Sequence, residues 1–289
     1  MASEPSIAPK VGATGNPRGS ERVAVELEGL VCSFPGHDRN GGPFTAVRNL
    51  NLRVNDGEFV AVVGPTGCGK STILNVAAGL LQPTAGAVRI FGEPLAGLNR
   101  RAGYLFQADS LMPWRNGTEN VAVGLEYRGV ARPEAERRAD EWLARVGLAG
   151  RGRAYPHQLS GGMKKRVSLA QTLILDPEII LMDEPFSALD VQTRLLMENE
   201  LLEIWAANRK SVIVITHDLE EAILLADRVV VLSAGPATHA IGDFPIDLPR
   251  PRDVSEIRTD TRFVELYKRI WQAMKEEVLK GYAQSKARP

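Results

Sequence analysis

A glycine-rich loop in the first third of the chain holds the densest group of residues that can do chemistry. Its sequence is Gly64-Pro65-Thr66-Gly67-Cys68-Gly69-Lys70-Ser71-Thr72. The apolar run 59–63 precedes the loop, and the run 72–81, which has helical character, follows it. A G-x-x-x-x-G-K-[ST] sequence between a strand and a helix is typical of a loop that binds phosphate groups.

Each residue type in this loop has a physical role toward a polyphosphate. Gly64, Gly67 and Gly69 let the backbone turn tightly and bring several N–H groups close to one anion. The helix that follows presents its unpaired N–H groups and its dipole to the same place. Lys70 can place a charge between the terminal phosphates, and the Ser71 hydroxyl can ligate Mg²⁺. A glycine-rich turn that binds nothing is the weaker alternative, because all these features agree.

Two carboxylates follow an apolar run later in the chain. Residues 179–182 are Ile-Ile-Leu-Met, and Asp183 and Glu184 come directly after them. This pattern predicts a buried strand that ends in two acids, at the edge where open α/β sheets bind their ligands. Asp183 is the expected Mg²⁺ partner beside Ser71, and Glu184 can orient or deprotonate an attacking water. An exposed acidic turn is the alternative, and the phosphate loop upstream makes it much weaker.

A third motif, Leu159-Ser160-Gly161-Gly162-Met163, opens a predicted helix. A serine followed by two glycines at a helix N-terminus is another shape that can bind an anion. The basic residues 164–166 come next. Taken alone, this motif is better explained as an ordinary helix cap.

The elements around these motifs predict an α/β fold. Between residues 100 and 217, short apolar strands alternate with helices, which indicates a mostly parallel sheet with helices on both faces. The short strands near the N-terminus predict a smaller antiparallel layer. The remaining expectations are helical character over 118–148, helices over 163–175, 195–208 and 219–226, a linker with extended pieces over 234–251, and a final helical region over 255–282.

Composition narrows the class of protein. The chain has 289 residues and a formal net charge of zero, which argues against a protein that mainly binds nucleic-acid backbone. Its two cysteines, Cys32 and Cys68, indicate neither a disulfide framework nor a zinc site. Cys68 lies inside the phosphate loop. We interpret it as a small filler; the alternative is that alkylation of its thiol would block nucleotide binding.

The chain shows no signal for membrane insertion. No stretch approaches the roughly 20 apolar residues of a membrane span. Residues 1–22 are rich in Ser, Pro, Gly and Ala, and we expect them to form a disordered tail without a signal peptide. We therefore expect a cytoplasmic protein that reaches a membrane only by docking, as a peripheral protein on its cytoplasmic face.

Together the motifs resemble those of the nucleotide-binding subunit of ATP-binding cassette (ABC) transporters, in family order from Val23 to Ile241. The phosphate loop and Asp183-Glu184 resemble the two Walker motifs, and residues 159–163 resemble the signature motif. The resemblance then assigns further residues by position. These are Gln107 as the Q-loop glutamine, which senses γ-phosphate, Mg²⁺ and the membrane partner; Asp190 in a D-loop formed by 187–190; His217 as the switch histidine; and Phe34 as the aromatic residue that stacks on adenine.

Two positions depart from the common family pattern. Met163 replaces a glutamine after Ser-Gly-Gly, and Phe34 replaces a tyrosine whose stacking needs only the ring face. Residues 111–115, Leu-Met-Pro-Trp-Arg, and residues 120–126 are similar to the nitrate/sulfonate/taurine importer branch, and Met163 fits that branch.

The resemblance implies a motor that works as a pair. Two chains clamp two ATP molecules, with Ser160 and Gly162 of one chain contacting the γ-phosphate bound by the other and His217 acting in cis. One phosphate loop and one signature turn per chain independently favour a composite site. The partners are a second copy of the chain, integral membrane permease subunits and, indirectly, a solute-binding protein. The segment 107–115 is the expected docking surface, with Leu111, Met112 and Trp114 either exposed there or part of an ordinary core.

The resulting expectation is a P-loop ABC ATPase with ATP and Mg²⁺ as ligands. Its domains are the tail 1–22, a cassette over 23–250 with a helical subdomain at about 108–176, and a C-terminal helical extension over 251–289. A soluble ABC-type ATPase of DNA repair or translation is the alternative function. The single cassette, the neutral charge and the lack of a long coiled-coil insertion disfavour it. A non-catalytic regulator is also disfavoured, because Lys70 and both acids are present.

The expected site has three groups of residues. They are the catalytic residues Glu184, His217 and Gln107; the nucleotide-binding residues Phe34, Gly64, Pro65, Thr66, Gly67, Cys68, Gly69, Lys70, Ser71, Thr72, Ser160, Gly161, Gly162 and Asp190; and the metal-binding residues Ser71, Gln107 and Asp183.

Overall fold

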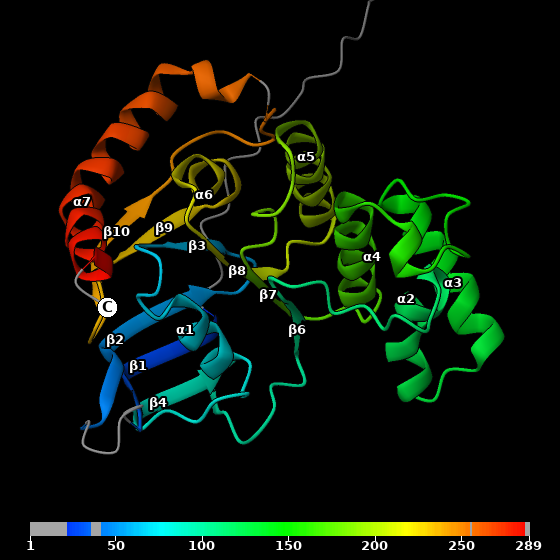
Figure 1. Cartoon of the computed structure of the whole chain (residues 1–289), viewed down its shortest axis with the longest axis horizontal. Coiled ribbons are helices and arrows are strands. Elements are labelled where there is room, and N and C mark those ends of the chain that lie inside the picture. The colour runs from blue at the N-terminus through cyan, green and yellow to red at the C-terminus, as the bar shows by residue number, and fades with distance from the viewer. Residues whose placement is uncertain (1–21, 36–41, 255, 287–289) are drawn as a thin grey trace, which may run out of the picture.

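The computed structural model describes residues 22–35, 42–254 and 256–286. Within them the chain folds around two sheets and the helices that cover them (Figure 1). The expected tail lies outside the described residues, except for Arg22.

The central sheet has six strands in the order β10-β9-β3-β8-β7-β6. Five of them run parallel, and β10 alone pairs antiparallel, with β9. This confirms the mostly parallel sheet that the apolar runs predict. The strands are β3 (Phe59–Val63), β6 (Ala102–Leu105), β7 (Ile179–Asp183), β8 (Ser211–Thr216), β9 (Arg228–Leu232) and β10 (Ala240–Pro245).

The register of this sheet brings the ends of three strands together. Val63 pairs with Thr216, and Asp183 pairs with Ile215. Since parallel strands end at the same edge, the residues that follow β3, β7 and β8 lie side by side. That edge therefore collects the phosphate loop, the two acids and His217.

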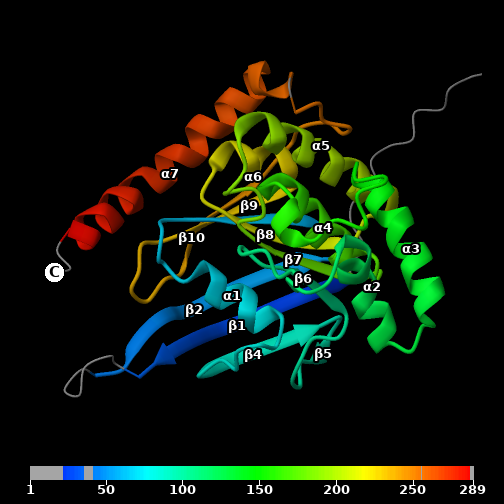
Figure 2. The ribbon, with the colours of Figure 1, turned by 45° about the vertical axis from the view of Figure 1, so that its right-hand side comes forward.

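The smaller sheet is antiparallel, as expected, with the order β2-β1-β4-β5. Helix α1 (Lys70–Ala77) lies between the two sheets (Figure 2). The apolar residues of α1 share one core cluster with residues of both sheets, and this fixes the helix that starts at the phosphate loop. The strands are β1 (Val23–Phe34), β2 (Phe44–Asn55), β4 (Ala85–Ile90) and β5 (Glu93–Pro94).

The other face of the central sheet packs against most of the remaining helices, in a second core cluster. In Figure 1, α2 and α3 lie beyond α4 on the side away from α7. The helices are α2 (Gly117–Tyr127), α3 (Arg132–Arg145), α4 (Gly161–Leu173), α5 (Val191–Asn208), α6 (Leu219–Leu225) and α7 (Thr261–Lys286), with short 3₁₀ turns at Pro156–Gln158 and Ile257–Thr259.

Several element boundaries differ from the sequence-based expectation. The helix after the phosphate loop begins at Lys70, directly after a left-handed Gly69, and ends at Ala77, before a left-handed Gly79. The helical region 118–148 is two helices. The expected linker contains β10, which the periodicity of residues 240–245 did not reveal.

No helix among the described residues is both long enough and apolar enough to cross a membrane.

Candidate functional site

An open cleft of about 500 Å³ lies at the edge where the parallel strands end. Four separate segments of the chain meet in it. Its lining residues are Thr66, Gly67, Gly69, Lys70, Ser71, Thr72, Gln107, Glu184 and His217. The structure therefore brings together most of the predicted phosphate loop, one of the two predicted acids, and Gln107 and His217, which are two of the four residues that the family resemblance adds.

The phosphate loop holds its own lysine in place. The Lys70 side chain is 6% exposed, and its Nζ donates to the backbone oxygens of Gly64 and Pro65, each at 2.9 Å. Cys68 is buried beneath the loop, and burial raises the pKa of its thiol. A buried, protonated thiol is a poor nucleophile, which supports the filler interpretation over the alkylation alternative.

Asp183 ends β7 beside the start of α1. Its side chain is buried, and burial raises the pKa of its carboxyl group, while a hydrogen bond from Ser71 and the charge of Lys70 oppose that shift. The Ser71 hydroxyl and the Asp183 carboxylate are adjacent oxygen donors of the kind that Mg²⁺ prefers. No cluster of three or more His, Cys, Asp or Glu suited to a metal ion occurs in the described part of the chain. Two such oxygen donors fit a Mg²⁺ ion that takes its other ligands from phosphate and water.

Glu184 is held in a restrained conformation that directs it into the cleft. Its φ is 45°, a left-handed conformation that a non-glycine residue rarely adopts, and its backbone N–H donates to the oxygen of Ile215 at 2.9 Å. The carboxylate accepts a hydrogen bond from Nε2 of Gln107 at 3.0 Å and lies 3.3 Å from Nδ1 of His217. This geometry suits a base or an orienting group for a water molecule in the cleft.

The loop that carries Gln107 is fixed by a residue that the sequence analysis did not assign. Lys165 on α4 is 3% exposed, and its Nζ donates to the backbone oxygens of Phe106 at 3.0 Å and Gln107 at 2.5 Å. Burial lowers the pKa of this lysine. Of the basic residues that follow the Ser-Gly-Gly turn, Lys165 thus holds the chain's own backbone. Its only sequence signal was its place in that basic run.

The Ser160-Gly161-Gly162 turn does not line the cleft. The Ser160 hydroxyl caps α4 by accepting from the N–H of Met163 at 3.3 Å. A Cβ on Gly162 would lie 2.5 Å from Cγ2 of Thr193 at the start of α5, so a larger residue fits there only if the Thr193 side chain shifts. Asp190 caps α5 and accepts from the N–H and the hydroxyl of Thr193, at 2.9 and 2.7 Å. The two motifs therefore pack together as one surface, apart from the cleft of their own chain.

Phe34 lies at the end of β1, where it pairs with Phe44. Its side chain is half-buried, and it is not among the residues that line the cleft.

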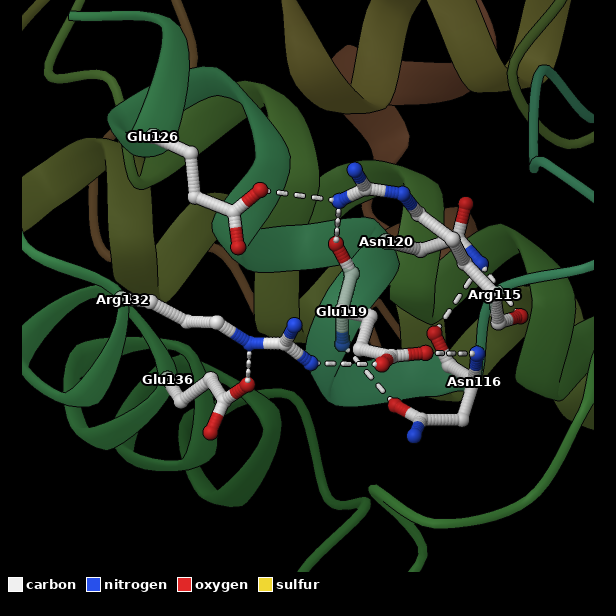
Figure 3. Close-up of polar contacts among 7 residues, drawn as sticks. All are labelled: Arg115, Asn116, Glu119, Asn120, Glu126, Arg132 and Glu136. Atoms are coloured by element: carbon white, nitrogen blue, oxygen red, sulfur yellow. Dashed lines mark hydrogen bonds and ion pairs between the residues drawn. The ribbon is translucent and has the colours of Figure 1, made fainter. Parts of the chain in front are cut away.

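Residues 111–120 comprise the loop before α2 and the first turn of that helix; this segment, here named the 111–120 loop, is held by one amide side chain (Figure 3). Asn120 is fully buried. Its Oδ1 accepts from the N–H of Met112 at 2.7 Å, and its Nδ2 donates to the backbone oxygens of Met112, Arg115 and Asn116 at 2.9–3.2 Å. Trp114, which belongs to this 111–120 loop, is 74% exposed.

Ion pairs extend this arrangement into the neighbouring helices. Arg115 contacts Glu126 at 3.0 Å, and Arg132 reaches both Glu119 at 2.9 Å and Glu136 at 2.7 Å (Figure 3). Polar side chains of α2 and α3 thus hold the base of the loop, while Leu111 and Met112 are half-buried.

A polar group that is partly buried lies behind the cleft, between α5 and α6. Arg194 donates to Asp218 at 3.0 Å and to the backbone oxygen of Leu189 at 3.5 Å. Glu221 accepts from the hydroxyl of Thr216 at 3.1 Å, and burial raises its pKa to about 8. These contacts join the segment before α5 to the strand end that carries His217.

Comparisons with known proteins agree with this geometry. The family model described as ABC transporter matches residues 47–187. A taurine import ATP-binding protein of Burkholderia pseudomallei is 44% identical over 230 residues, covering 78% of this chain and 88% of that protein. A nitrate import ATP-binding protein of Synechococcus elongatus is 42% identical over 230 residues, covering 78% and 83%.

A solved structure shares the fold. It is a dimeric, post-hydrolysis state of an ATP-binding cassette bound to ADP and Pi. It aligns with a TM-score of 0.69 and 31% identity, and the alignment covers 78% of this chain and all of that one.

Proposed function

The chain belongs to the ABC transporter family as an ATP-binding subunit that hydrolyses ATP, and on this premise we propose that it drives solute import through a separate membrane permease. The proposed solute is a small anion of the nitrate, sulfonate or taurine type. This proposal is supported by the two relatives, which are a taurine and a nitrate import ATP-binding protein. The observation that carries the proposed mechanism is Glu184, placed between Gln107 and His217 beside the phosphate loop.

The proposed nucleotide contacts follow from the groups that face the cleft. The backbone N–H groups of 64–72 and the Lys70 ammonium bind the phosphates of ATP, and Phe34 stacks on the adenine. The Ser71 hydroxyl, Asp183 and Gln107 hold Mg²⁺, directly or through water. When bound, Mg²⁺ supplies positive charge that neutralises the phosphate oxygens.

Hydrolysis then requires a base and a residue that orients the γ-phosphate. Glu184 takes a proton from the water whose oxygen attacks the γ-phosphorus, and the bond from that phosphorus to the bridging oxygen breaks to leave ADP and phosphate. His217 donates a hydrogen bond to the γ-phosphate. Gln107 orients Glu184 through the 3.0 Å hydrogen bond described above.

Two copies of the chain form the complete site. Ser160, Gly161 and Gly162 of one copy contact the γ-phosphate bound in the other, and Asp190 lies at the junction. Two observations support this: these residues lie outside the cleft of their own chain, and the solved neighbour is a dimer. Because Gly162 packs against Thr193, the signature turn and the Asp190 segment move toward the partner together.

The permease docks on the 111–120 loop, beside the segment that carries Gln107. Trp114 offers an exposed aromatic ring on a loop whose backbone Asn120 fixes, which suits a helix-in-groove contact. The protein is then peripheral, on the cytoplasmic face of the membrane. We propose that the chain consists of a cassette over 23–250, with a helical subdomain at about 108–176, and a C-terminal helical extension over 251–289.

Gentle affinity purification of the tagged full chain from native membranes tests the function. A polytopic membrane protein in stoichiometric amount, together with a solute-binding protein, is the expected result, and ligand binding by that solute-binding protein identifies the anion. Ribosomes or DNA-repair factors without a membrane protein would replace the transport proposal with the soluble ABC-type ATPase.

A further inference from the structure

The last turns of α7 lie against the phosphate loop, although more than two hundred residues separate them in the sequence. Figures 1 and 2 both show the C-terminal half of α7 next to the segment between β3 and α1. A Cβ on Gly281 would lie 3.1 Å from Cβ of Pro65, so the helix backbone and the loop are in close contact. At this position a glycine permits the approach.

The same stretch of α7 makes a polar contact beside the loop. Oε2 of Glu277 accepts from the backbone N–H of Ala234 at 2.7 Å, and Oε1 contacts Nζ of Lys280 at 2.6 Å. Lys280 and the Ala234 N–H lower the pKa of Glu277, so the carboxylate is charged at neutral pH. A hydrogen bond to a charged acceptor is among the stronger ones in proteins.

The segment that Glu277 holds is itself in contact with the phosphate loop. Gly235 lies beside Cα of Cys68, where an added Cβ would be at 3.4 Å. The hydroxyl of Thr238 donates to the backbone oxygen of Cys68. The N–H of Ala237 donates to the oxygen of Thr45 at 2.8 Å. Residues 234–238 therefore lie between α7 and the floor of the loop.

Pro65 connects these contacts to the nucleotide-binding groups. Its backbone oxygen accepts from Nζ of Lys70 at 2.9 Å and from the N–H of Cys68 at 3.3 Å. A shift of Pro65 would therefore move the lysine and the turn of the loop together. Gly281 therefore contacts Pro65, the residue whose backbone oxygen positions both the Lys70 side chain and the turn at Cys68.

The rest of α7 is firmly attached to the molecule. Phe263, Ile270 and Met274 are at most 5% exposed and belong to the core cluster that also contains residues of β9 and α6. The C-terminal turns are thus carried by a helix whose other end is packed into the core. A rigid support of this kind can restrain a loop against which it rests.

We propose that α7 braces the phosphate loop in its nucleotide-binding shape, with Glu277 and Gly281 as positioning residues. The inference rests on the proposed role of the 64–72 loop in ATP binding. A loop that is already ordered loses less conformational entropy when it binds a ligand, so the brace strengthens ATP binding. Neither residue touches the nucleotide. The role assigned to the extension is thereby specific: it tunes affinity for ATP.

The test compares MgATP binding by the full-length chain and its variants, by titration calorimetry. Glu277→Ala should weaken binding roughly three- to tenfold, the effect of losing one hydrogen bond. Glu277→Gln should bind nearly as the parent does, because its amide oxygen still accepts from Ala234. Gly281→Leu, which favours helix but pushes on Pro65, should also weaken binding. Glu276→Ala, the exposed neighbour on the same helix, is the matched control and should change nothing.

A second readout separates bracing from general loss of structure. The weakened variants should raise KM for ATP more than they lower kcat, with melting temperatures close to that of the parent chain. Unchanged affinity in both Glu277→Ala and Gly281→Leu would overturn the brace, as would equal weakening by Glu276→Ala. Lys70→Ala separates failure of the brace from failure of the proposed ATP-binding role of the 64–72 loop. If Lys70→Ala also binds ATP normally, the assignment of the 64–72 loop is wrong.

Discussion

The cleft and the 111–120 loop use the same kinds of polar residue in opposite ways. In the cleft, Glu184 and His217 lie at strand ends and line open space, where they also contact each other. In the 111–120 loop, Asn120 uses both of its amide atoms on the backbone and leaves an apolar ring, that of Trp114, facing outward. A polar side chain thus serves ligand binding where its partner lies outside the chain, and serves loop shape where its partner lies within it.

The largest expected effect is on ATP hydrolysis, from a change at Glu184 in the cleft. Glu184→Gln keeps the hydrogen bonds that position the side chain but removes its capacity as a base, so kcat should fall by about 10²- to 10⁴-fold while ATP still binds. Steady-state hydrolysis and MgATP titration on the same preparation measure both. Glu178→Gln, at the opposite end of β7, is the matched control. Near-parental turnover in Glu184→Gln would end its assignment as the base.

Lys70→Ala should act on binding instead. The lysine supplies charge-assisted hydrogen bonds to phosphate, each of about 1.5–3 kcal/mol, so affinity for MgATP should fall by roughly one to two orders of magnitude. Lys210→Ala, at the far end of β8, should leave affinity unchanged. Equal affinity in the two variants would mean that the cleft does not hold phosphate at this loop.

Asn120→Ala tests the other region, the 111–120 loop, whose backbone Asn120 holds. The change removes the hydrogen bonds to Met112, Arg115 and Asn116 and leaves buried backbone groups unpaired, so the free energy of unfolding should fall by about 1–3 kcal/mol. Denaturant titration measures the loss. ATP hydrolysis by the isolated chain should persist, since the residue lies outside the cleft.

Trp114→Ala is the matched partner of Asn120→Ala. It removes the exposed aromatic ring of the 111–120 loop and leaves the hydrogen bonds of Asn120 intact. Its unfolding free energy should stay within about 0.5 kcal/mol of the parent, as for most surface changes. Both variants should weaken capture of the permease. A strong loss of ATP hydrolysis in either isolated chain would break the distinction between the two regions.

The acids behind the cleft should have the smallest effect on ATP binding and hydrolysis, and they act instead on how stability depends on pH. Burial raises the pKa of Glu198 to about 7 and that of Glu221 to about 8, from ordinary values of 4.5, with Arg194, Asp218, Arg258 and Glu220 nearby. The folded chain therefore keeps protons that the unfolded chain loses. Stability from these groups is fully present below pH 4.5 and is lost as pH rises toward 8.

Glu221→Gln should flatten this decline, because each unit by which burial raises the pKa of Glu221 corresponds to about 1.4 kcal/mol of pH-dependent stability. Denaturant titrations of the parent and the variant between pH 5 and 8.5 measure it. Parallel curves would show that the carboxyl group is already ionised in the fold.

The residues of the cleft could be predicted from the sequence, whereas the residues that hold the surrounding backbone in place could not. The phosphate loop, Asp183 and Glu184 are recognisable because their chemistry needs fixed spacing along one segment. Lys165 and Glu277 act on backbone atoms of distant segments, and such contacts depend on how α4 and α7 pack. Extended pieces were expected in the segment that holds β10, but its pairing with β9 and the exact helix ends depend on a strand partner and on local turns.

Arg252 has a consequence for where the chain can be cut. Its guanidinium donates to the backbone oxygens of Ile223, Leu224 and Ala226 at the end of α6, and to that of Leu248. A chain truncated at residue 250 would leave these carbonyls without that donor, in the helix directly after His217. A shortened chain should therefore keep Arg252 and the fully buried Val254. A truncation designed to remove α7 should begin after Val254 rather than at residue 251.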